Sequence, residues 1–425
     1  MTWFGDLSIY RSLLLLLLFI LGVSNLRRVL IMVTVCMRQW TNYDVSPLAE
    51  STYAPFVSVV IPAFNEEKNI EQTIQMVLTS SYQNFEVIVV DDGSEDNTSF
   101  IVKNAFIGNQ RLKVLTKDNG GKATALNYGI NHAQGEIIIA LDADTLFTQE
   151  TIARLVRHFE TPNIGAVAGN LLVGNASNII THCQAIEYVI DQNFERYAHD
   201  QLHCINVVPG AVGAWRKNAL VAAGGYSSDT LTEDADLTWT IQELGWRVRN
   251  ERTALAFTEA PHTIEAFLRQ RYRWTFGTLQ TMLKHRKTLF KNSTLGWIAF
   301  PGIISQILAC IVTPCVDIIV IITLFVNGPD RIVSVYFAMI ILDFVLALFG
   351  YFLIQAKCIN LLWIVPQRLL YRPVMIYVIL KSLWSILVRH EVKWNKLERR
   401  GDSRIDDVLV NSVISSNPLP VLLND

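Results

Sequence analysis

Two aspartates that directly follow an apolar run are the first residues of this sequence that could carry chemistry. The run covers residues 137–141, and Asp142 and Asp144 follow it with one residue between them. A short, continuous apolar run predicts a strand buried on both faces, which is typical of parallel sheets, and ligands of such sheets bind beyond the carboxyl ends of the strands. Two carboxylates without a neighbouring histidine or cysteine suit Mg²⁺ or Mn²⁺ carrying phosphates. A solvated aspartate turn is the alternative.

Two further polar clusters could bind a nucleotide. Asp91 and Asp92 follow the apolar run 86–90, and their carboxylates could accept hydrogen bonds from a base or a ribose. Gly120-Gly121-Lys122 opens a predicted helix and offers N–H groups and an ammonium to a diphosphate. Taken alone, each cluster is also compatible with a plain turn. The sequence has no GxGxxG after its first predicted strand and no GxxxxGK[ST], which argues against a dinucleotide oxidoreductase and a P-loop ATPase.

The later part of the chain adds a third and a fourth cluster. Thr232-Glu233-Asp234 precedes a predicted helix, so capping of that helix is the alternative to a catalytic role. The segment 208–211 is a break that could line an acceptor site. Gln270-Arg271-Tyr272-Arg273-Trp274 places two cations and two aromatic rings in five residues. Arg, Tyr and Trp all favour the lipid headgroup layer, so an interfacial anchor is the alternative there.

The elements that must position these clusters alternate between strand and helix. We expect strands over 57–61, 86–90, 112–115 and 137–141, with helices over 65–78, 96–106 and 122–132 between them. This alternation predicts parallel β-α-β units with right-handed crossovers. The polar clusters that follow the strands therefore face one edge of a single sheet. The predicted class is an α/β domain with a mostly parallel sheet over residues 55–290.

Apolar segments flank this domain and predict a membrane protein. Residues 7–26 are long enough to cross a bilayer, and Arg27, Arg28 and Arg38 follow, so the amino terminus is expected outside and the α/β domain in the cytoplasm. A cleaved signal peptide is the alternative. Residues 303–326 and 332–355 could also cross, joined by an outer loop at 327–330. Basic residues bracket 361–365 and 374–388, which favours an interfacial or re-entrant segment, with a fourth span left open; 29–37 also looks interfacial. The expected division is 1–54, 55–290 and 291–425.

Composition supports this organisation and limits the partners. Hydrophobic residues make up 51% of the chain and charged residues 17%, which is too apolar for an ordinary soluble enzyme. The 36 basic residues nearly balance the 38 acidic ones, so nothing favours nucleic acid as a partner. The six cysteines show no CxxC spacing, which favours free thiols in a reducing compartment. Asp317 and Asp343 lie inside predicted spans, where acids either face a watery path or pair between helices.

The motifs together resemble a known family. Pro62-Ala63-Phe64-Asn65-Glu66, Asp91-Asp92-Gly93-Ser94, Gly121-Lys122, Asp142-Ala143-Asp144, Thr232-Glu233-Asp234 and Gln270-Arg271-Tyr272-Arg273-Trp274 occur in this order. The set resembles the family 2 glycosyltransferases with a GT-A fold, specifically the processive membrane-bound synthases of cellulose, chitin, hyaluronan and poly-β-1,6-N-acetylglucosamine. The resemblance covers roughly residues 55–285. Asp-x-Asp alone is weakly specific, whereas the ordered set ending in Q-R-x-R-W is strongly so.

The resemblance implies a role for each motif. Asp234 is the expected general base, and Asp144 with Asp142 is expected to hold Mg²⁺ or Mn²⁺ on the diphosphate of a UDP-sugar. The residues expected to bind substrate are Pro62, Asn65, Glu66, Asp91, Asp92, Lys122, Asp142, Glu233, Gln270, Arg271, Arg273 and Trp274. One base without a second carboxylate acting as nucleophile implies a single inverting displacement and β-linkages. UDP-N-acetylglucosamine is the preferred donor on overall likeness alone.

The same resemblance implies partners and a location. The chain is expected to be a multi-pass protein of the cell (inner) membrane that elongates a polysaccharide, with export as an extension of the family pattern. Because three or four spans enclose little channel, a homo-oligomer or a small membrane subunit is expected to complete it. The alternatives are a non-processive transferase with a lipid-linked acceptor, which generally lacks Q-R-x-R-W, and a catalytically silent export scaffold. Intact Asp142, Asp144 and Asp234 argue against the scaffold.

Overall fold

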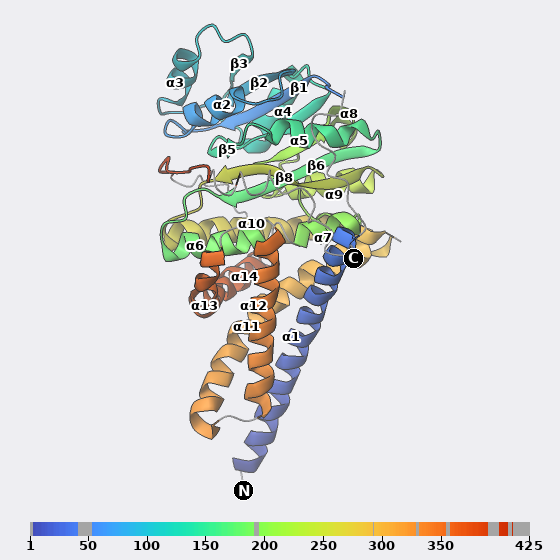
Figure 1. Cartoon of the computed structure of the whole chain (residues 1–425), viewed down its shortest axis with the longest axis vertical. Coiled ribbons are helices and arrows are strands. Elements are labelled where there is room, and N and C mark those ends of the chain that lie inside the picture. Colours follow the sequence, from blue (N-terminus) through green and yellow to red (C-terminus); the bar gives the residue numbers. More distant parts are fainter. Residues whose placement is uncertain are drawn as a thin grey trace, which may run out of the picture.

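The chain folds into an α/β domain that sits on a group of long helices (Figure 1). The computed structural model describes residues 3–40, 53–190, 195–291, 293–328, 331–353, 358–389, 399–406 and 410. The helices α1 (Trp3–Trp40), α11 (Phe300–Asn327) and α12 (Arg331–Leu353) run away from the domain. Helix α10 (Ile264–Lys284) lies between the domain and these helices.

One eight-stranded sheet organises the domain. Its order is β3-β2-β1-β4-β7-β6-β8-β5, and β3, β2, β1 and β4 are parallel neighbours. Strand β7 is antiparallel to β4, which places the second half of the domain beside the first. The strands are β1 (Val57–Ala63), β2 (Phe85–Asp91), β3 (Leu112–Thr116), β4 (Ile137–Ala140), β5 (Thr145–Phe147), β6 (Ile164–Val173), β7 (Gly213–Arg216) and β8 (Arg247–Thr258). The mostly parallel α/β sheet predicted from the sequence is therefore confirmed.

Helices cover both faces of this sheet. They are α2 (Ile70–Leu78), α3 (Thr98–Ala105), α4 (Lys122–His132), α5 (Thr151–Val156), α6 (Ile179–Glu187), α7 (Glu195–Gln201), α8 (Lys217–Ala222) and α9 (Glu233–Glu243). Val59 and Ile61 of β1 pack on one face with Ile74 of α2. Val60 points to the other face and packs with Leu126 of α4. Burial on both faces explains why the strands read as continuous apolar runs.

The predicted elements recur with one clear correction. The sequence predicted a helix from residue 65, but α2 begins at Ile70. Asn65 has a positive φ of 54° and its Oδ1 accepts from the Glu95 N–H at 2.7 Å, so it holds a neighbouring loop and does not cap the helix. Asparagine tolerates this left-handed conformation better than most residues. Among the described cysteines, Cys183, Cys204, Cys310 and Cys315 are free, as the thiol prediction requires.

Helix α1 is one continuous helix that packs with α11 and α12 (Figure 1). Residues 29–37 are therefore the later part of this helix, and their interfacial placement remains a prediction. Leu18 and Leu21 of α1 are buried against Val316 of α11, which is expected of a retained helix and not of a cleaved signal peptide. Within the part of the chain that the structure describes, three helical segments, Leu15–Thr34, Leu295–Val326 and Leu361–Leu387, are long and apolar enough to cross a membrane, and Ser334–Phe349 is a shorter apolar stretch.

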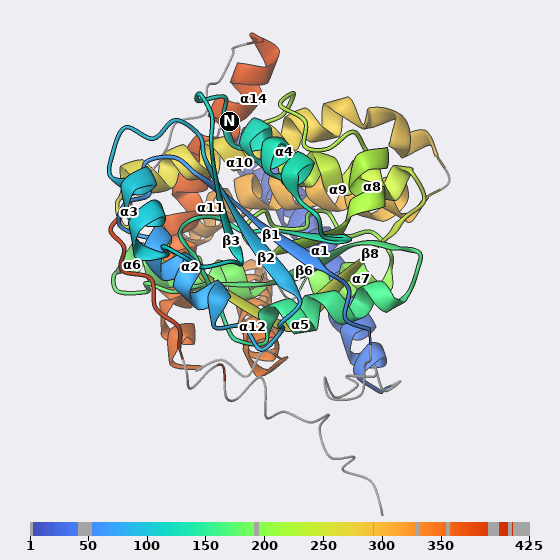
Figure 2. The same cartoon turned by 90° about the horizontal axis from the view of Figure 1, so that it is seen from above.

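Helix α14 (Arg372–Leu387) differs in direction from these long helices. It follows the short helix α13 (Ile364–Pro366) and packs against α10, where the Tyr272 hydroxyl donates to Ser385 at 2.7 Å. Seen from above, it projects sideways beyond the α/β domain (Figure 2). A helix lying crosswise at the base of the domain is what an interfacial segment would look like, so the interfacial placement remains our prediction for this part of the chain.

Candidate functional site

A cavity of about 510 Å³ lies where the α/β domain meets the long helices. Its domain side carries residues from most of the predicted motifs, and its other side carries residues of α1, α11, α12 and α14. The predicted site residues that line it are Lys122, Asp142, Glu233, Asp234, Gln270, Arg271, Arg273 and Trp274. Lys122 and Trp274, which are 152 positions apart in the sequence, therefore share one cavity. The predicted site residues that do not line it are Pro62, Asn65, Glu66, Asp91, Asp92 and Asp144.

Lys122 lies among three carboxylates at the start of α4. Its Nζ is 2.6 Å from Asp142 Oδ1 and 3.3 Å from Glu233 Oε1. Burial lowers the pKa of Lys122, but the charges of Asp142, Glu233 and Asp234 outweigh it and raise that pKa above its ordinary value. Lys122 is therefore a permanent cation in the cavity. Gly121 directly precedes α4, and its positive φ of 87° lets the chain turn into that helix.

Asp234 is held by the backbone at the start of α9. Its Oδ2 accepts from Gly210 N at 3.0 Å and its Oδ1 from Ala235 N at 2.8 Å. A Cβ at Gly210 would lie only 2.8 Å from Lys122 Nζ, so a side chain there would displace the end of Lys122. Burial and the neighbouring Glu233 raise the pKa of Asp234 to about 6. Thr232 makes no side-chain cap to α9, whereas Asp234 accepts an N–H group in the first turn of that helix, so support of the helix start accounts for part of this motif.

Asp142 and Asp144 emerge after β4 as predicted, but they face different cations. Asp142 contacts Lys122, whereas Asp144 Oδ2 lies 2.5 Å from Arg399 Nη2. Thr145 Oγ1 donates to Asp144 Oδ1 at 3.1 Å. The residues fit a divalent ion because two hard carboxylates are present and a positive charge already stands against Asp144. An ion here would have to compete with Lys122 at Asp142 and with Arg399 at Asp144.

Asp91 and Asp92 end β2 and organise the adjacent loops. Asp91 Oδ1 accepts from Ser94 N at 3.0 Å. Asp92 accepts from Lys117 Nζ at 2.6 Å and from Gly121 N at 2.8 Å. The side chain of Asp92 therefore fixes the glycine turn in front of Lys122. Its predicted contact with the base or ribose remains a prediction.

The predicted binding residues after β1 also serve the loop beside them. Pro62 pairs with Val90 within the sheet. Asn65 N donates to Ser94 Oγ at 2.9 Å, and Glu66 N donates to Thr98 Oγ1 at 2.7 Å. These bonds join the ends of β1 and β2. Pro62, Asn65 and Glu66 are not among the residues that line the cavity, so their predicted contacts with substrate remain a prediction.

The five-residue motif lies on α10 with most of its side chains turned inward. Gln270 and Arg271 are only 4% and 3% exposed, which excludes them as anchors in a lipid headgroup layer. Arg271 Nη2 is 2.9 Å from Glu187, and its guanidinium lies 4.5 Å from the centre of the Trp274 ring. Gln270 Oε1 is buried without a hydrogen-bond partner among the described residues. Arg273 is half-buried and lines the cavity with Trp274.

We expect Glu187→Gln to lower the unfolding temperature of the detergent-solubilised chain. The change removes the charge opposite buried Arg271 and weakens the acceptor of the Tyr371 hydroxyl. Loss of one partner of such a pair costs about 2 kcal/mol here, below the fully buried limit because the Glu187 side chain keeps 16% exposure. Glu265→Gln is the matched control, since its pair with Arg269 is exposed and should contribute almost nothing. Equal melting curves for both variants would contradict the assignment.

The two acids within the predicted spans have different surroundings. Asp317 is buried and accepts from the Tyr336 hydroxyl at 2.6 Å and from Arg368 Nη2 at 2.7 Å. Asp343 lies 2.8 Å from Arg28 Nη1 and 2.6 Å from Arg368 Nη1, and it lines the cavity. Pairing between helices therefore explains Asp317. Asp343 combines such pairing with a place on the cavity wall.

Three residues of the site were missed in the sequence. Arg399 lies far from every motif, and its segment shows only a basic cluster. Glu187 lies within an ordinary helix, α6, without a distinctive neighbour. Gly210 was named only as part of a break. One signal was available, because residues 269–274 contain three arginines and no acid. A buried cation such as Arg271 requires an anionic partner, which then has to come from another part of the chain.

The fold and the cavity define the class of the protein, a GT-A-like glycosyltransferase fold with candidate membrane helices. A solved structure with this arrangement is that of a mannosyltransferase from Pyrobaculum calidifontis in complex with GDP-mannose and Mn²⁺. It superposes with a TM-score of 0.59 over 86% of this chain and 99% of that chain, at 20% sequence identity. The identity is low enough that the likeness concerns the fold.

The sequence comparisons place the domain in a family. Residues 58–219 match Glycosyl transferase family 2, so the chain carries a domain of that family. Poly-β-1,6-N-acetyl-D-glucosamine synthase of Staphylococcus aureus is 31% identical over 229 residues, covering 54% of this chain and 56% of that protein. The synthase of Staphylococcus epidermidis is 31% identical over 242 residues, covering 56% and 58%. The match thus spans a little over half the length of these curated relatives.

Proposed function

We propose that this protein is a metal-dependent, inverting glycosyltransferase that polymerises a β-linked polysaccharide from a UDP-sugar, with UDP-N-acetylglucosamine as the preferred donor. The observation that carries the proposal is the placement of Asp234 in one cavity with Lys122, Asp142 and Trp274. A base, a cation for a diphosphate, a metal-type carboxylate and an aromatic platform are the groups that sugar transfer requires. The names of the curated relatives support the choice of donor.

The donor is proposed to lie along the ends of β1, β2 and β4. Asp91 would meet the base or ribose, and the turn fixed by Asp92 would direct Lys122 toward the diphosphate. Asp142 and Asp144 would hold Mg²⁺ or Mn²⁺, which neutralises charge on the departing UDP when it is bound. Arg273 adds positive charge on the opposite wall of the cavity.

The acceptor is proposed to enter from the side of α10. Asp234 would take the proton from the acceptor hydroxyl as that oxygen attacks C1 of the donor sugar. Its fixed bonds to Gly210 and Ala235 leave the carboxylate oriented before the acceptor arrives. The Trp274 ring would support the apolar face of the acceptor sugar, and the unpaired Gln270 oxygen could accept from a sugar hydroxyl. A single displacement inverts the anomeric centre and gives a β-linkage.

The pH profile of transfer tests the role of Asp234. The base acts when ionised, so the rate should fall as the pH drops below about 6, the pKa of Asp234. Glu233 raises that pKa by its charge. Glu233→Gln should therefore move the acidic limb of kcat/KM to lower pH by about half a pH unit, whatever it does to the maximal rate. A limb that stays in place or moves to higher pH would contradict this.

The donor is tested with membranes containing the chain and a panel of labelled UDP-sugars. Incorporation from UDP-N-acetylglucosamine above that from UDP-glucose, UDP-galactose and UDP-glucuronic acid is expected. It should depend on added Mg²⁺ or Mn²⁺ and disappear with excess EDTA. Incorporation from none of the donors, beside an active control enzyme, would overturn the proposed transferase. Incorporation from another UDP-sugar would replace only the donor.

A lipid-linked acceptor is the second candidate. The observation in its favour is the lining of the cavity on the membrane side, where apolar Ile303 and Met339 lie near Arg28 and Arg372. Such a wall could take an acyl or prenyl chain with an anionic head. Label that partitions into organic solvent as a single-sugar product would favour this candidate over a polymerase.

The proposed location is the cell (inner) membrane, with several spans and the α/β domain in the cytoplasm. Arg27 and Arg28 lie in the second half of α1, within the candidate span Leu15–Thr34, and Arg27 pairs there with Glu195 of α7. The positive-inside rule would put this half of the helix toward the cytoplasm. Growing polysaccharide and the lipid bilayer are the proposed partners, and nucleic acid is not. A homo-oligomer or a small membrane subunit remains a prediction. Coupling of polymerisation to export is proposed from the resemblance to the membrane-bound synthases.

A further inference from the structure

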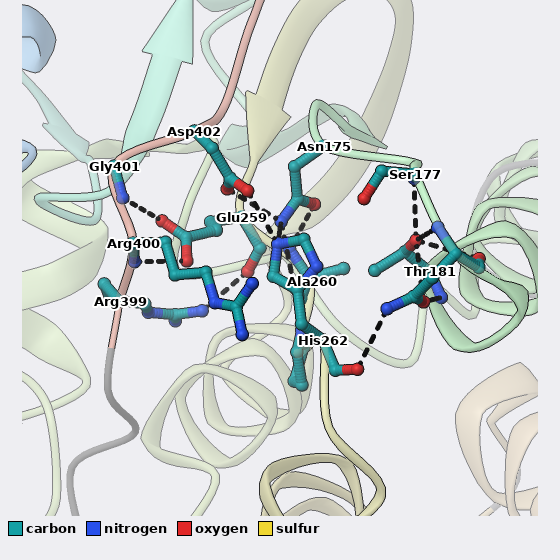
Figure 3. A network of polar contacts seen from close by, with 12 residues as sticks. Asn175, Ser177, Thr181, Glu259, Ala260, His262, Arg399, Arg400, Gly401 and Asp402 are labelled. Carbon is teal, nitrogen blue, oxygen red and sulfur yellow. Dashed lines mark hydrogen bonds and ion pairs between the residues drawn. The ribbon is translucent and has the colours of Figure 1, made fainter.

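A short segment near the end of the chain returns to the α/β domain and reaches the candidate metal site. We call residues 399–406 the C-terminal strap. Figure 3 shows it docked beside Glu259, Asn175 and His262. Its Arg404 N donates to Gly174 O at 3.0 Å, so the strap follows the ends of β6 and β8. Its Gly401 has a φ of 75°, and a Cβ there would lie 2.8 Å from Lys68 O.

The docking contacts of the strap are specific. Glu259 is 3% exposed, and its two oxygens accept from Arg400 N at 2.7 Å and Gly401 N at 3.0 Å. Asp402 Oδ2 lies 2.8 Å from His262 Nε2, and Asp402 Oδ1 accepts from Asn175 Nδ2 at 3.1 Å. Figure 3 shows these bonds converging from the strap and from the loops after β6 and β8.

The same residues could be taken for a metal site, because Glu259, His262 and Asp402 bring one ligand atom each within 4.8 Å of one another. However, both oxygens of Glu259 already accept backbone N–H groups of the strap, and His262 Nε2 and Asp402 contact each other. These contacts account for the cluster as a docking site for the strap, so we assign no ion to it.

The docked strap places one cation, the guanidinium of Arg399, beside the candidate metal site. Arg399 Nη1 donates to Glu259 O at 2.6 Å, and Nη2 lies 2.5 Å from Asp144 Oδ2. The side chain of Asp144 is only 5% exposed and that of Arg399 18%. The guanidinium thus stands against the carboxylate that our proposed function assigns to the divalent ion, and it also lines the cavity.

We propose that Arg399 is an internal counter-cation that competes with the divalent ion for Asp144, and that the C-terminal strap holds it there until the ion binds. This inference rests on the proposed role of Asp144. Asp144 Oδ2 already pairs with the guanidinium, whose positive charge repels a divalent ion that approaches either oxygen of this carboxylate. The Glu259 carboxylate binds the backbone N–H groups of Arg400 and Gly401 and so tethers Arg399 beside Asp144. The local concentration of the guanidinium is therefore high, and the ion must displace it. The strap therefore sets the ion concentration at which the donor site becomes competent.

The test measures binding of Mn²⁺ alone, without nucleotide, to the full-length chain in detergent. The signal of free Mn²⁺ in electron paramagnetic resonance reports the bound fraction directly. Arg399→Ala should bind Mn²⁺ at least about fivefold more tightly than the wild-type chain, because the competing cation is gone. Arg399→Lys should fall between the two. Arg404→Ala is the matched control, since Arg404 is an exposed arginine of the same strap, and it should bind as the wild type does.

A second readout follows the strap itself. Hydrogen exchange at the amides of Arg400, Gly401 and Arg404, which donate to the domain, should quicken when Mn²⁺ is added to the wild-type chain. Asp402→Ala, which loses the contacts with His262 and Asn175, should quicken this exchange without the ion and tighten Mn²⁺ binding. Unchanged exchange upon saturation with Mn²⁺ would contradict displacement of the strap.

Asp144→Asn separates this inference from the proposed function. If Mn²⁺ binding is lost in Asp144→Asn but equal in Arg399→Ala and the wild type, the ion site stands and the competition is refuted. If Mn²⁺ binding is the same in Asp144→Asn as in the wild type, the metal assignment itself fails. Tighter binding in Arg399→Ala together with loss in Asp144→Asn is the result that we expect.

Discussion

Asp234→Asn should reduce sugar transfer by at least about a thousandfold while leaving binding of the metal–UDP complex nearly unchanged. General-base catalysis contributes about 10²–10⁴ in rate, and the amide cannot take the proton. At present Gly210 N and Ala235 N donate to different oxygens of Asp234, so the single amide oxygen of asparagine can accept from only one of them. Loss of one such hydrogen bond costs about 1 kcal/mol, so the fold and the donor side should survive the substitution.

The measurement pairs turnover of a labelled donor with equilibrium binding of UDP by calorimetry. Asp229→Asn is the matched control, because Asp229 lies shortly before α9 in the chain, its side chain is 71% exposed, and it pairs at the surface with Lys284. The control should transfer normally. Retained transfer in Asp234→Asn would end its assignment as the base, and loss of UDP binding would indicate a role in the donor site.

Asp144→Asn should have the second largest effect, about a thousandfold loss of transfer at an Mn²⁺ concentration that saturates the wild type. Metal stabilisation of a departing diphosphate contributes several kcal/mol, which corresponds to about three decades in rate. Asp142 remains as a second carboxylate, so a high concentration of Mn²⁺ should restore part of the activity.

The dependence of rate on Mn²⁺ concentration checks this prediction. A shift of the midpoint to higher concentration, with partial recovery at the plateau, is expected. Asp229→Asn again serves as the control and should keep the wild-type midpoint. A lower plateau with the same midpoint would show that Asp144 acts by some means other than holding the ion.

Much of the fold could be predicted because it depends on local patterns. The runs 57–61, 86–90 and 137–141 read as buried strands and lie within or at β1, β2 and β4. The polar residues after them were expected at one edge because parallel strands end together. The start of α2 was missed because Asn65 adopts a left-handed conformation to hold the loop at Glu95, a contact between segments 30 residues apart.

The site could be predicted only in part because several contacts join distant segments. Lys122, Asp142 and Asp234 occur in recognisable motifs, and the structure brings them to one cavity. Arg399 reaches Asp144 across 255 positions, and Arg271 meets Glu187 across 84. No local pattern predicts such pairs. The structure also gives Asp92 a supporting contact with the glycine turn that its position alone did not suggest.

The most direct test of the account is the size of the product that the purified chain makes from UDP-N-acetylglucosamine and Mn²⁺. A short pulse of labelled donor, followed by an excess of unlabelled donor, should give label inside long chains while most acceptor molecules remain unextended. β-Specific hydrolysis should release the label from these chains. A product extended by one sugar only would contradict the proposed polymerase.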